Sequence, residues 1–365
     1  MLKKLTLAAT LTLSTAICAF AAEPRHGGTL NFTAPYGSSF ATLDAQSSPT
    51  IQSMFVTEAI HRGLYSWDIE ANEPALELAD SVEISDDGLT YTYHLKKNAV
   101  FHNGKSLTAD DIIFSYMRIG DPKNAFPGAT KITTIAGGRD YTEGKADGIS
   151  GLKKIDDNTL EITFATPANP GFSLMERYMA IYPSDVDPAT QATAPVGLGA
   201  FVFKEHVPGS QASFDRFDKY YEEGQPYLDH LNVILMAEGS ARDVAFRNKE
   251  VDVSILGPAQ YQSYQNDPDL QEHILEVAEV FTRNIGFNKD VEALSDKRVR
   301  QAINYAINSK LIIEKLAKNK AFPATGWPPD SAGRSAGCRA IRRRFPARVK
   351  GSARCVPPAG SSSPP

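Results

Sequence analysis

The residues best suited to chemistry in this sequence are seven histidines, a few adjacent carboxylates and one glycine-rich run. No histidine stands at metal-site spacing from another histidine or a carboxylate. Asp229-His230 comes nearest, but a metal needs three or four convergent ligands, so we interpret it as a surface turn. Asp110-Asp111 follow Thr108, and we expect them to cap and charge the first turn of a helix. We predict no catalytic residue, no metal site and no cofactor.

The remaining motifs of catalysis are absent or incomplete. Gly197-Leu198-Gly199 begins like a dinucleotide-binding loop, but the third glycine is missing, and we expect a turn into a strand. There is no G-x-S-x-G elbow of a serine hydrolase. The cysteines are Cys18, Cys338 and Cys355, so residues 22–330 offer no thiol. A pair of catalytic carboxylates has no fixed spacing, so an exported carboxylate-dependent hydrolase stays open as the alternative function.

The charge of the chain is unevenly distributed. The 365 residues carry a net charge of −5, but residues 331–365 alone are +8 and the rest −13. An acidic body argues against nucleic acid as a partner, because phosphate binding needs clustered cations. Residues 331–365 hold seven arginines, whereas arginine is sparse in all that precedes them. They show no apolar period, and we expect disorder there.

Two origins for this basic tail stay open. Translation in a wrong reading frame of GC-rich DNA would explain the abrupt change in residue usage. A true basic tail would bind anionic surfaces, which would make the protein membrane- or polyanion-associated.

The amino-terminal segment 1–21 has the three parts of a secretory signal peptide. Lys3 and Lys4 precede an apolar stretch that ends in Ala19-Phe20-Ala21, a small-residue cleavage signal. Ile17 precedes Cys18 where a lipoprotein signal needs a small residue. We therefore predict a soluble exported product, and the cysteine-free body suits a bacterial periplasm.

The spacing of apolar residues along the chain predicts the strands and helices that would position any site. Alternating apolar residues predict strands near 28–34, 81–84, 90–95, 152–155, 160–164, 201–204, 212–214, 231–236, 251–256 and 281–288. Helical spacing predicts helices near 50–61, from Thr108, from Ser240 to about 248, from Ser295 with a stripe through Val299 and Ile303, and from Ser309 to about 318. Strands mixed with helices indicate an α/β or mixed α+β fold.

Three stretches resemble the extracellular solute-binding proteins of peptide and nickel ABC transporters, the dipeptide- and oligopeptide-binding family. The longest is residues 79–115, ADSVEISDDGLTYTYHLKKNAVFHNGKSLTADDIIFS. The second is residues 196–201, VGLGAF, in which Ala200 replaces the usual proline. The third is Phe287-Asn288 followed by residues 296–307, DKRVRQAINYAI. The resemblance covers about residues 27–329.

The resemblance implies a two-lobed periplasmic-binding-protein clamp with an extra subdomain in the first lobe. It divides the chain into the signal peptide 1–21, a first-lobe core of 22–64 and 170–275, the subdomain 65–169, and a hinge crossing with the start of the second lobe at 276–330. The basic tail 331–365 has no counterpart. Family members are substantially longer, so the second lobe is expected to be incomplete and the product as written truncated, partly folded and impaired.

The resemblance also implies a function without chemistry: delivery of a small solute to a membrane ABC permease by cleft closure. A peptide is the leading ligand, while an opine-like conjugate, a nickel complex or haem stays open. We expect a monomer. The candidate ligand-binding residues lie after the first strand, in the next segment and in the crossing strand: Tyr36, Phe40, Thr50, Arg283 and Asn284. An arginine at 283 could hold a carboxylate in bidentate fashion. Each has an alternative role in packing, loop surface or a structural ion pair.

Overall fold

The computed structural model describes residues 25–34, 40, 42–48, 50–69, 71, 73–167, 169–276 and 284–323. The predicted signal peptide, the basic tail, Tyr36 and Arg283 lie outside these residues. Strands and helices alternate in a mixed α/β fold, as expected from the sequence.

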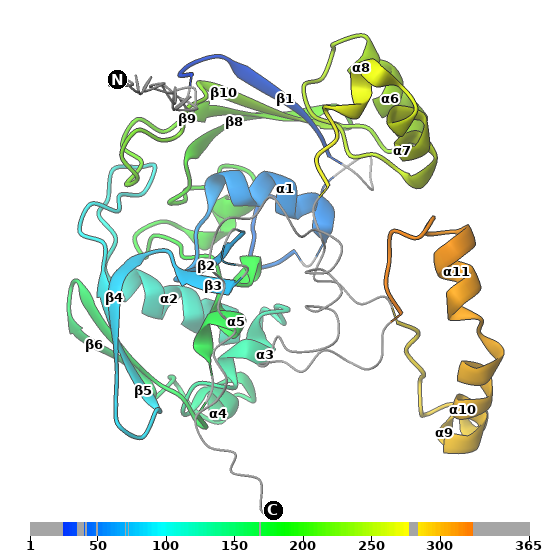
Figure 1. Ribbon diagram of the computed structural model, residues 1–365. Helices are drawn as coiled ribbons and strands as arrows, with labels where there is room; N and C mark the ends of the chain where they lie inside the picture. Colours follow the sequence, from blue (N-terminus) through cyan, green and yellow to red (C-terminus); the bar gives the residue numbers. More distant parts are fainter. Residues whose placement is uncertain are drawn as a thin grey trace, which may run out of the picture.

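Sheet A joins β1 (Thr29–Ala34), β10 (His230–Leu235), β9 (Gln211–Arg216) and β8 (Phe201–Val207) in that order. β1 runs parallel to β10, and the other two pairings are antiparallel. Helix α1 (Ile51–Ile60) lies beneath the sheet in Figure 1. Val56 and Ile60 of this helix share a core with inward-facing strand residues such as Phe214 and Val233, because alternate strand residues point to one face.

Sheet C is a second, all-antiparallel sheet in the order β4 (Ala79–Ile84), β5 (Thr90–Leu95), β7 (Thr159–Thr163) and β6 (Leu152–Asp156). Every second residue of β5 is buried, and these residues meet α2 (Ala109–Gly120) in the larger core. Ile112, Tyr116 and Ile119 of α2 are fully buried there, so the predicted helical stripe is a true core face.

The start of α2 confirms the capping role predicted for Asp111, and places Asp110 in the first turn as expected. Asp111 accepts hydrogen bonds from the backbone nitrogen and hydroxyl of Thr108, both at 2.9 Å. The same buried carboxylate also accepts from the backbone nitrogen of Ser184 at 2.8 Å and from the ammonium group of Lys105. Asp110 faces outward and pairs with Lys154 at 2.6 Å. Asp111 therefore ties the helix to a distant loop as well as capping it.

The glycine turn at residues 197–199 joins the two cores. A Cβ atom on Gly197 would lie 2.1 Å from the carbonyl oxygen of Ile60, and one on Gly199 would lie 2.3 Å from that of Ala59. The Gly199 backbone nitrogen donates to the Ile60 oxygen at 2.6 Å. Only residues without a side chain can approach the end of α1 this closely. The glycines thus serve packing, and the strand β8 follows the turn as predicted.

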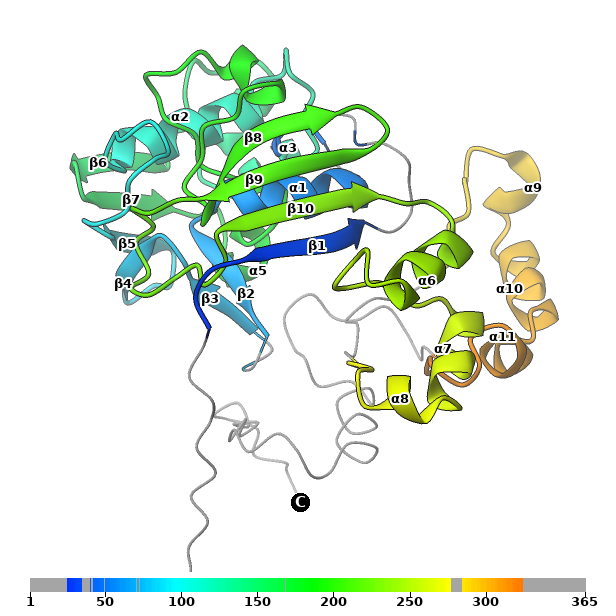
Figure 2. The same ribbon diagram turned by 90° about the horizontal axis from the view of Figure 1, so that it is seen from above.

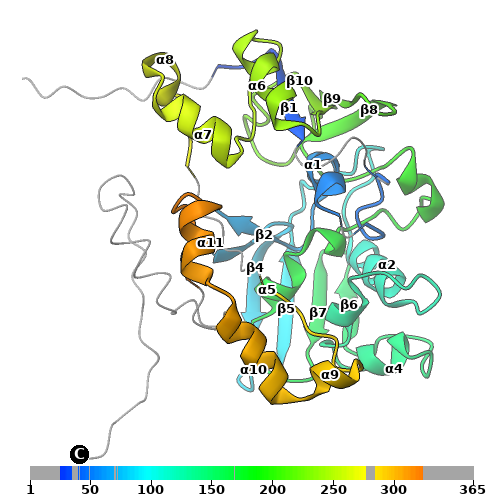
Figure 3. The ribbon, with the colours of Figure 1, turned by 90° about the vertical axis from the view of Figure 1, so that its right-hand side faces the viewer.

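The remaining elements are short. A two-stranded sheet pairs β2 (Tyr65–Asp68) with β3 (Glu73–Leu76). The other helices of this part are α3 (Ala129–Ile132), α4 (Gly138–Thr142), α5 (Pro170–Leu174), the 3-10 turns Arg177–Met179 and Pro188–Ala192, α6 (Gly239–Arg247), α7 (Pro258–Gln265) and α8 (Pro268–Gln271). Three further helices follow: α9 (Glu292–Ser295), α10 (Lys297–Ala306) and α11 (Ser309–Lys315). Figures 2 and 3 show α11 beside α7, and none of the described side chains of α9, α10 and α11 is buried.

Four element predictions were wrong in detail, two for strands and two for helix caps. Residues 251–256 form no strand, but Asp252 and Val253 hydrogen-bond to β1 around a single parallel bridge between Val253 and Phe32. Within the predicted strand 281–288, residues 284–288 are irregular, and residues 281–283 lie outside the described part. The cap of α10 is Asp296, one residue after the predicted Ser295, because its carboxylate accepts from the backbone nitrogen of Arg298 at 2.7 Å.

The cap of α6 also differs from expectation. The helix begins at Gly239, with Glu238 as a cap residue that makes no side-chain cap bond, so Ser240 lies inside the first turn. Buried Arg242 instead secures the entry to this helix, because its guanidinium donates to the carbonyl oxygens of Met236 and Ala237, both at 2.7 Å.

Candidate functional site

The carboxyl ends of three strands meet at one edge of sheet A. β1 and β10 are parallel, with Ala34 opposite Leu235. β8 runs in the same direction, because two antiparallel steps separate it from β10. In open α/β sheets, ligands bind outside the carboxyl ends of parallel strands. This edge is therefore the candidate binding face.

A hollow of about 460 Å³ lies at this edge, beside the end of β8. It is lined by Phe40, Thr42, Leu43, Ala192, Thr193, Phe203, Glu205 and His206. Two phenyl rings, one imidazole, two hydroxyls and one carboxylate give it both apolar surface and polar groups. Such a lining suits a small solute with mixed character and offers no nucleophile paired with a base.

Phe40 contributes to this hollow from a packed position. Its side chain is only 7% exposed and belongs to the core under sheet A. Its ring centroid lies 4.2 Å from that of His206. The Nε2 atom of His206 is buried and has no hydrogen-bond partner among the described residues. Phe40 thus presents only part of its ring to the hollow, and most of the ring supports the strand end.

Thr50 begins the helix beneath the sheet. Its hydroxyl oxygen accepts from the backbone nitrogen of Ser53 at 3.4 Å and lies 3.1 Å from the hydroxyl of Ser48. The residue itself is exposed. Phe40 and Thr50 therefore stand at the two ends of one connecting segment between β1 and α1.

We call residues 42–48 of that connection the strap, and its centre is a buried ion pair. The Asp44 carboxylate receives Arg118 from α2 through both oxygens, at 2.6 and 3.3 Å. Tyr182 donates its hydroxyl to the same carboxylate at 2.7 Å. Burial alone would raise the pKa of Asp44, but the bonds and charge of Arg118 and the Tyr182 hydroxyl hold this pKa below its usual value. Asp44 is thus a permanent anion at neutral pH.

Of the other predicted site residues, Asn284 is exposed and belongs to the segment that leads to α9, away from the strap in sequence. Tyr36 and Arg283 lie outside the described residues. Sequence reasoning missed Asp44, Arg118, Thr42 and His206. An aspartate set directly between apolar Leu43 and Ala45 was the one available signal, since a charge in such surroundings needs a partner.

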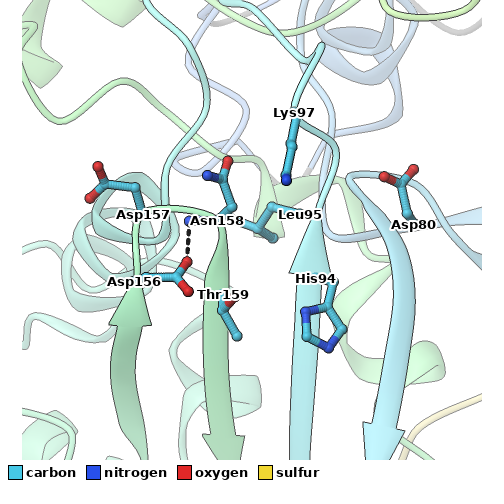
Figure 4. Close-up of a pocket in the computed structure, with 8 residues that line it drawn as sticks. All are labelled: Asp80, His94, Leu95, Lys97, Asp156, Asp157, Asn158 and Thr159. Carbon is cyan, nitrogen blue, oxygen red and sulfur yellow. Dashed lines mark hydrogen bonds between the residues drawn. The ribbon is translucent and has the colours of Figure 1, made fainter.

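A second hollow of about 500 Å³ lies at one end of sheet C and is shown in Figure 4. Its lining is polar: Asp80, His94, Leu95, Lys97, Asp156, Asp157, Asn158 and Thr159. Several of its carboxylates already have partners. Asp157 pairs with Lys154 at 2.6 Å, and Asp156 accepts from the backbone nitrogen of Asn158 at 2.8 Å. Within the part of the chain that the structure describes, no cluster of three potential metal ligands occurs here or elsewhere.

No described helix is both long and apolar enough to cross a bilayer. An α/β body with a hollow at the carboxyl edge of its strands has the place where ligands bind in open α/β sheets. Residues 73–337 match the family model of bacterial extracellular solute-binding proteins, family 5. The chain belongs to this family, whose members bind substrates and are not enzymes, so the hydrolase alternative has no support.

Curated relatives agree with this assignment. The chain is 32% identical over 283 residues to haem-binding protein A of Haemophilus influenzae, a match that covers 70% of this chain and 49% of that protein. It is 28% identical over 312 residues to the dipeptide-binding protein of Escherichia coli K12, with 78% and 55% covered. The chain therefore spans about half the length of the curated relatives it matches.

Solved structures show the same fold. A periplasmic oligopeptide-binding protein of Borrelia burgdorferi aligns with a TM-score of 0.67 at 26% identity, covering 80% of this chain and 59% of that one. The PBP AgaA of A. tumefaciens R10, solved with agropinic acid, aligns with a TM-score of 0.69 at 28% identity, covering 85% and 60%. The fold is thus that of the two-lobed periplasmic binding proteins, as the sequence predicted.

Proposed function

We propose that this chain is the substrate-binding component of a bacterial ABC importer, and that its ligand is a peptide. The family match over residues 73–337 is the observation that carries the proposal. The name of the Escherichia coli relative favours a peptide. Haem is the second candidate ligand, because the Haemophilus influenzae relative is named for it.

The ligand is proposed to bind at the carboxyl edge of sheet A. The hollow beside β8 supports this place, and so does the position of Phe40 in its lining. Tyr36, Thr50 and Asn284 would contact the ligand near this edge, and Arg283 would hold its carboxylate. A carboxylate bound in bidentate fashion by arginine is the strongest of these contacts in chemical terms.

The lobe boundaries remain part of the proposal. Residues 22–64 and 170–275 would form the first-lobe core, residues 65–169 its extra subdomain, and residues 276–330 the crossing and the start of the second lobe. The core around sheet A includes none of the described buried residues of 65–169, which supports the first division, although the core around sheet C also includes residues from 170–275 such as Leu174, Met179 and Leu198.

Export to the periplasm as a soluble monomer, with cleavage after Ala21, completes the proposal. Intact-mass spectrometry of the protein recovered from the periplasm tests it. The expected mass is that of a chain beginning at Ala22, and retention of the segment 1–21 would contradict cleavage. Sedimentation of the same material gives the oligomeric state.

Calorimetry tests the ligand class on the chain from Ala22 onward. The titrants are a panel of di-, tri- and tetrapeptides, free amino acids, haem and nickel chloride. We propose that the incomplete second lobe impairs the chain as written, so we expect peptide binding that is weak but selective over free amino acids; tight, saturable one-to-one binding of a peptide would contradict the impairment and support the ligand. Binding of haem without binding of peptides would mean that the ligand is haem. Cleavage of the peptides to free amino acids would mean that the protein is a hydrolase and would contradict the proposed function.

A further inference from the structure

The strap has an internal anchor that lies outside the hollow. Asp44 and Gln46 sit close together on it, and both are buried. Arg118 donates to the side-chain oxygen of Gln46 at 2.5 Å as well as to Asp44. Gln46 in turn donates to the carbonyl oxygen of Ala180 at 2.8 Å. One guanidinium therefore fixes two strap residues at once, which a planar fork of donors does better than a point charge.

Hydrogen bonds also hold the strap on both sides of the ion pair. Toward Phe40, the backbone nitrogen of Leu43 donates to the carbonyl oxygen of Ala192 at 3.3 Å, and the Leu43 oxygen lies 3.2 Å from Nε2 of His61. Toward Thr50, the hydroxyls of Ser48 and Thr50 are 3.1 Å apart. The segment is hydrogen-bonded along its length, with the ion pair at its middle.

Arg118 comes from α2, which packs in the core of sheet C and not under sheet A. It is mostly buried, with a side chain 12% exposed, and its guanidinium also lies 4.7 Å from the ring centroid of Phe126 and 5.4 Å from that of Tyr182. Two aromatic rings and one carboxylate therefore leave it little freedom. Arg118 is supplied by the sheet C unit, whereas Tyr182 and Ala180, two other partners of the strap, belong to residues 170–275.

We propose that Arg118, acting through Asp44, is a positioning residue for the ligand site. It holds the strap in one conformation, so that the residues on either side of it, Phe40 and Thr50, are kept in place at the carboxyl edge of sheet A. The inference rests on the proposed function for its ligand, but the order of the strap is a property of the free protein. Through Arg118, sheet C and α2 would contribute to ligand binding, although they are distant in sequence from the strands that form the carboxyl edge of sheet A.

The expected effect on ligand affinity depends on the fraction of molecules in which the strap is ordered. If the strap is ordered only part of the time, the apparent dissociation constant rises by the inverse of the ordered fraction. Association slows in the same proportion, while dissociation from the formed complex changes little. A residue that merely stabilised the fold would leave both rates unchanged in any sample that is fully folded.

Arg118→Lys is the principal variant, because it keeps the charge but loses the fork that serves Asp44 and Gln46 together. Tyr182→Phe is the second, milder variant, since it removes only the hydroxyl at 2.7 Å from Asp44. Arg216→Lys is the matched control. Like Arg118, Arg216 contacts two polar side chains, here Asp218 and Asp229, both at 2.9 Å, but it is more exposed and these partners lie outside the strap.

Hydrogen exchange of the ligand-free protein is the first measurement. We expect exchange in residues 42–48 to become about tenfold faster in Arg118→Lys and less so in Tyr182→Phe, with β5 unchanged, because local opening costs less than global unfolding. Arg216→Lys should exchange as the parent does. If a folded variant shows unchanged exchange in the strap, the proposal is overturned, whatever the ligand proves to be. If Arg118→Lys does not fold, the same test is made with Tyr182→Phe.

The second measurement is the rate of peptide binding, with the tightest peptide of the calorimetric panel as probe. We expect an affinity about tenfold weaker in Arg118→Lys, carried by slower association, at a temperature where all variants are folded. A strap that exchanges faster while the affinity stays at the parent value would overturn the positioning role. If the parent protein binds no peptide, the proposed function fails, and the exchange result alone decides whether Arg118 orders the strap.

Discussion

Helices α2 and α10 have almost the same sequence pattern and opposite surroundings. Each begins with a capping residue and carries apolar residues at intervals of three and four. On α2, this stripe is buried against sheet C, and Ile112, Tyr116 and Ile119 are inaccessible to solvent. On α10, none of the described side chains is buried, and Val299 is 37% exposed.

The difference teaches what an amphipathic period can and cannot say. The period shows that the helix has one apolar face. Burying that face against another element lowers the free energy, because apolar surface is removed from water. It does not show which element supplies that cover. For α2, the covering strands are its neighbours in sequence, and the described part of the chain contains them.

Acid should separate the two regions most strongly. Burial lowers the pKa of His61 to about 3 and that of His102 to about 4. His102 stands between the Gly197 nitrogen at 3.4 Å and the Gly199 oxygen at 3.0 Å, so the neutral ring satisfies both. Residues 284–323, which include α10, contain no histidine.

The sign of this dependence follows from the proton count. Both histidines titrate lower in the folded state than the ordinary pKa of 6.5, so the unfolded chain binds more protons below that pH and stability falls as pH drops. Between pH 6.5 and 4.5 the loss is about 2 kcal/mol for each histidine, since one pH unit is worth at most roughly 1.4 kcal/mol. Urea unfolding at the two pH values measures it, and a His102→Gln variant should show a smaller loss. A pH-independent free energy would contradict the buried neutral state.

The next effect concerns the two stripes themselves. Ile112→Ala should lower the free energy of unfolding by about 3 kcal/mol, because it opens a cavity in a filled core. Ile303→Ala on α10 should cost clearly less than Ile112→Ala, since Ile303 is only partly buried and its truncation encloses no cavity. Urea unfolding followed by tyrosine fluorescence checks both. Equal losses would mean that α10 is covered in solution, and the comparison would then fail.

The smallest effect concerns the caps. Thr108→Ala removes the hydroxyl that bonds Asp111, and Asp296→Ala removes the carboxylate that caps α10. Each should cost about 1 kcal/mol locally. We expect only Thr108→Ala to change global unfolding, because α2 is part of the core, while Asp296→Ala should lower helical circular dichroism alone. A shift of the global midpoint by Asp296→Ala would show that the two regions unfold together.

Most regular elements of the fold could be predicted from the sequence, and the reasons are visible residue by residue. β5 alternates because one face of the strand is core, so its pattern follows the buried Tyr91, Tyr93 and Leu95. Residues 251–256 also have strand composition, but their backbone bonds to β1 are confined to Asp252 and Val253, and pairing depends on the partner as much as on propensity. The short helices α3, α4 and α5 carry no full period and gave no signal.

Less of the candidate site could be predicted. The position after the first strand led to Phe40, which does line the hollow, yet its packing against His206 depends on β8, a strand from a distant part of the sequence. The pairing of Asp44 with Arg118 joins positions 74 apart in sequence, and nothing in either segment alone reveals it. Long-range polar contacts of this kind leave no periodic trace.

The parallel pairing of β1 with β10 has a consequence for the order of folding. Thr29 finds its partner only at His230, whereas sheet C closes between Ala79 and Thr163. Closing a longer loop costs more entropy, and distant contacts form later. Sheet C can therefore assemble first, and the first strand of the chain must wait. A chain built in this way leaves β1 unpaired until residues 230–235 have been made, so sheet A can close only after sheet C is complete in the growing chain.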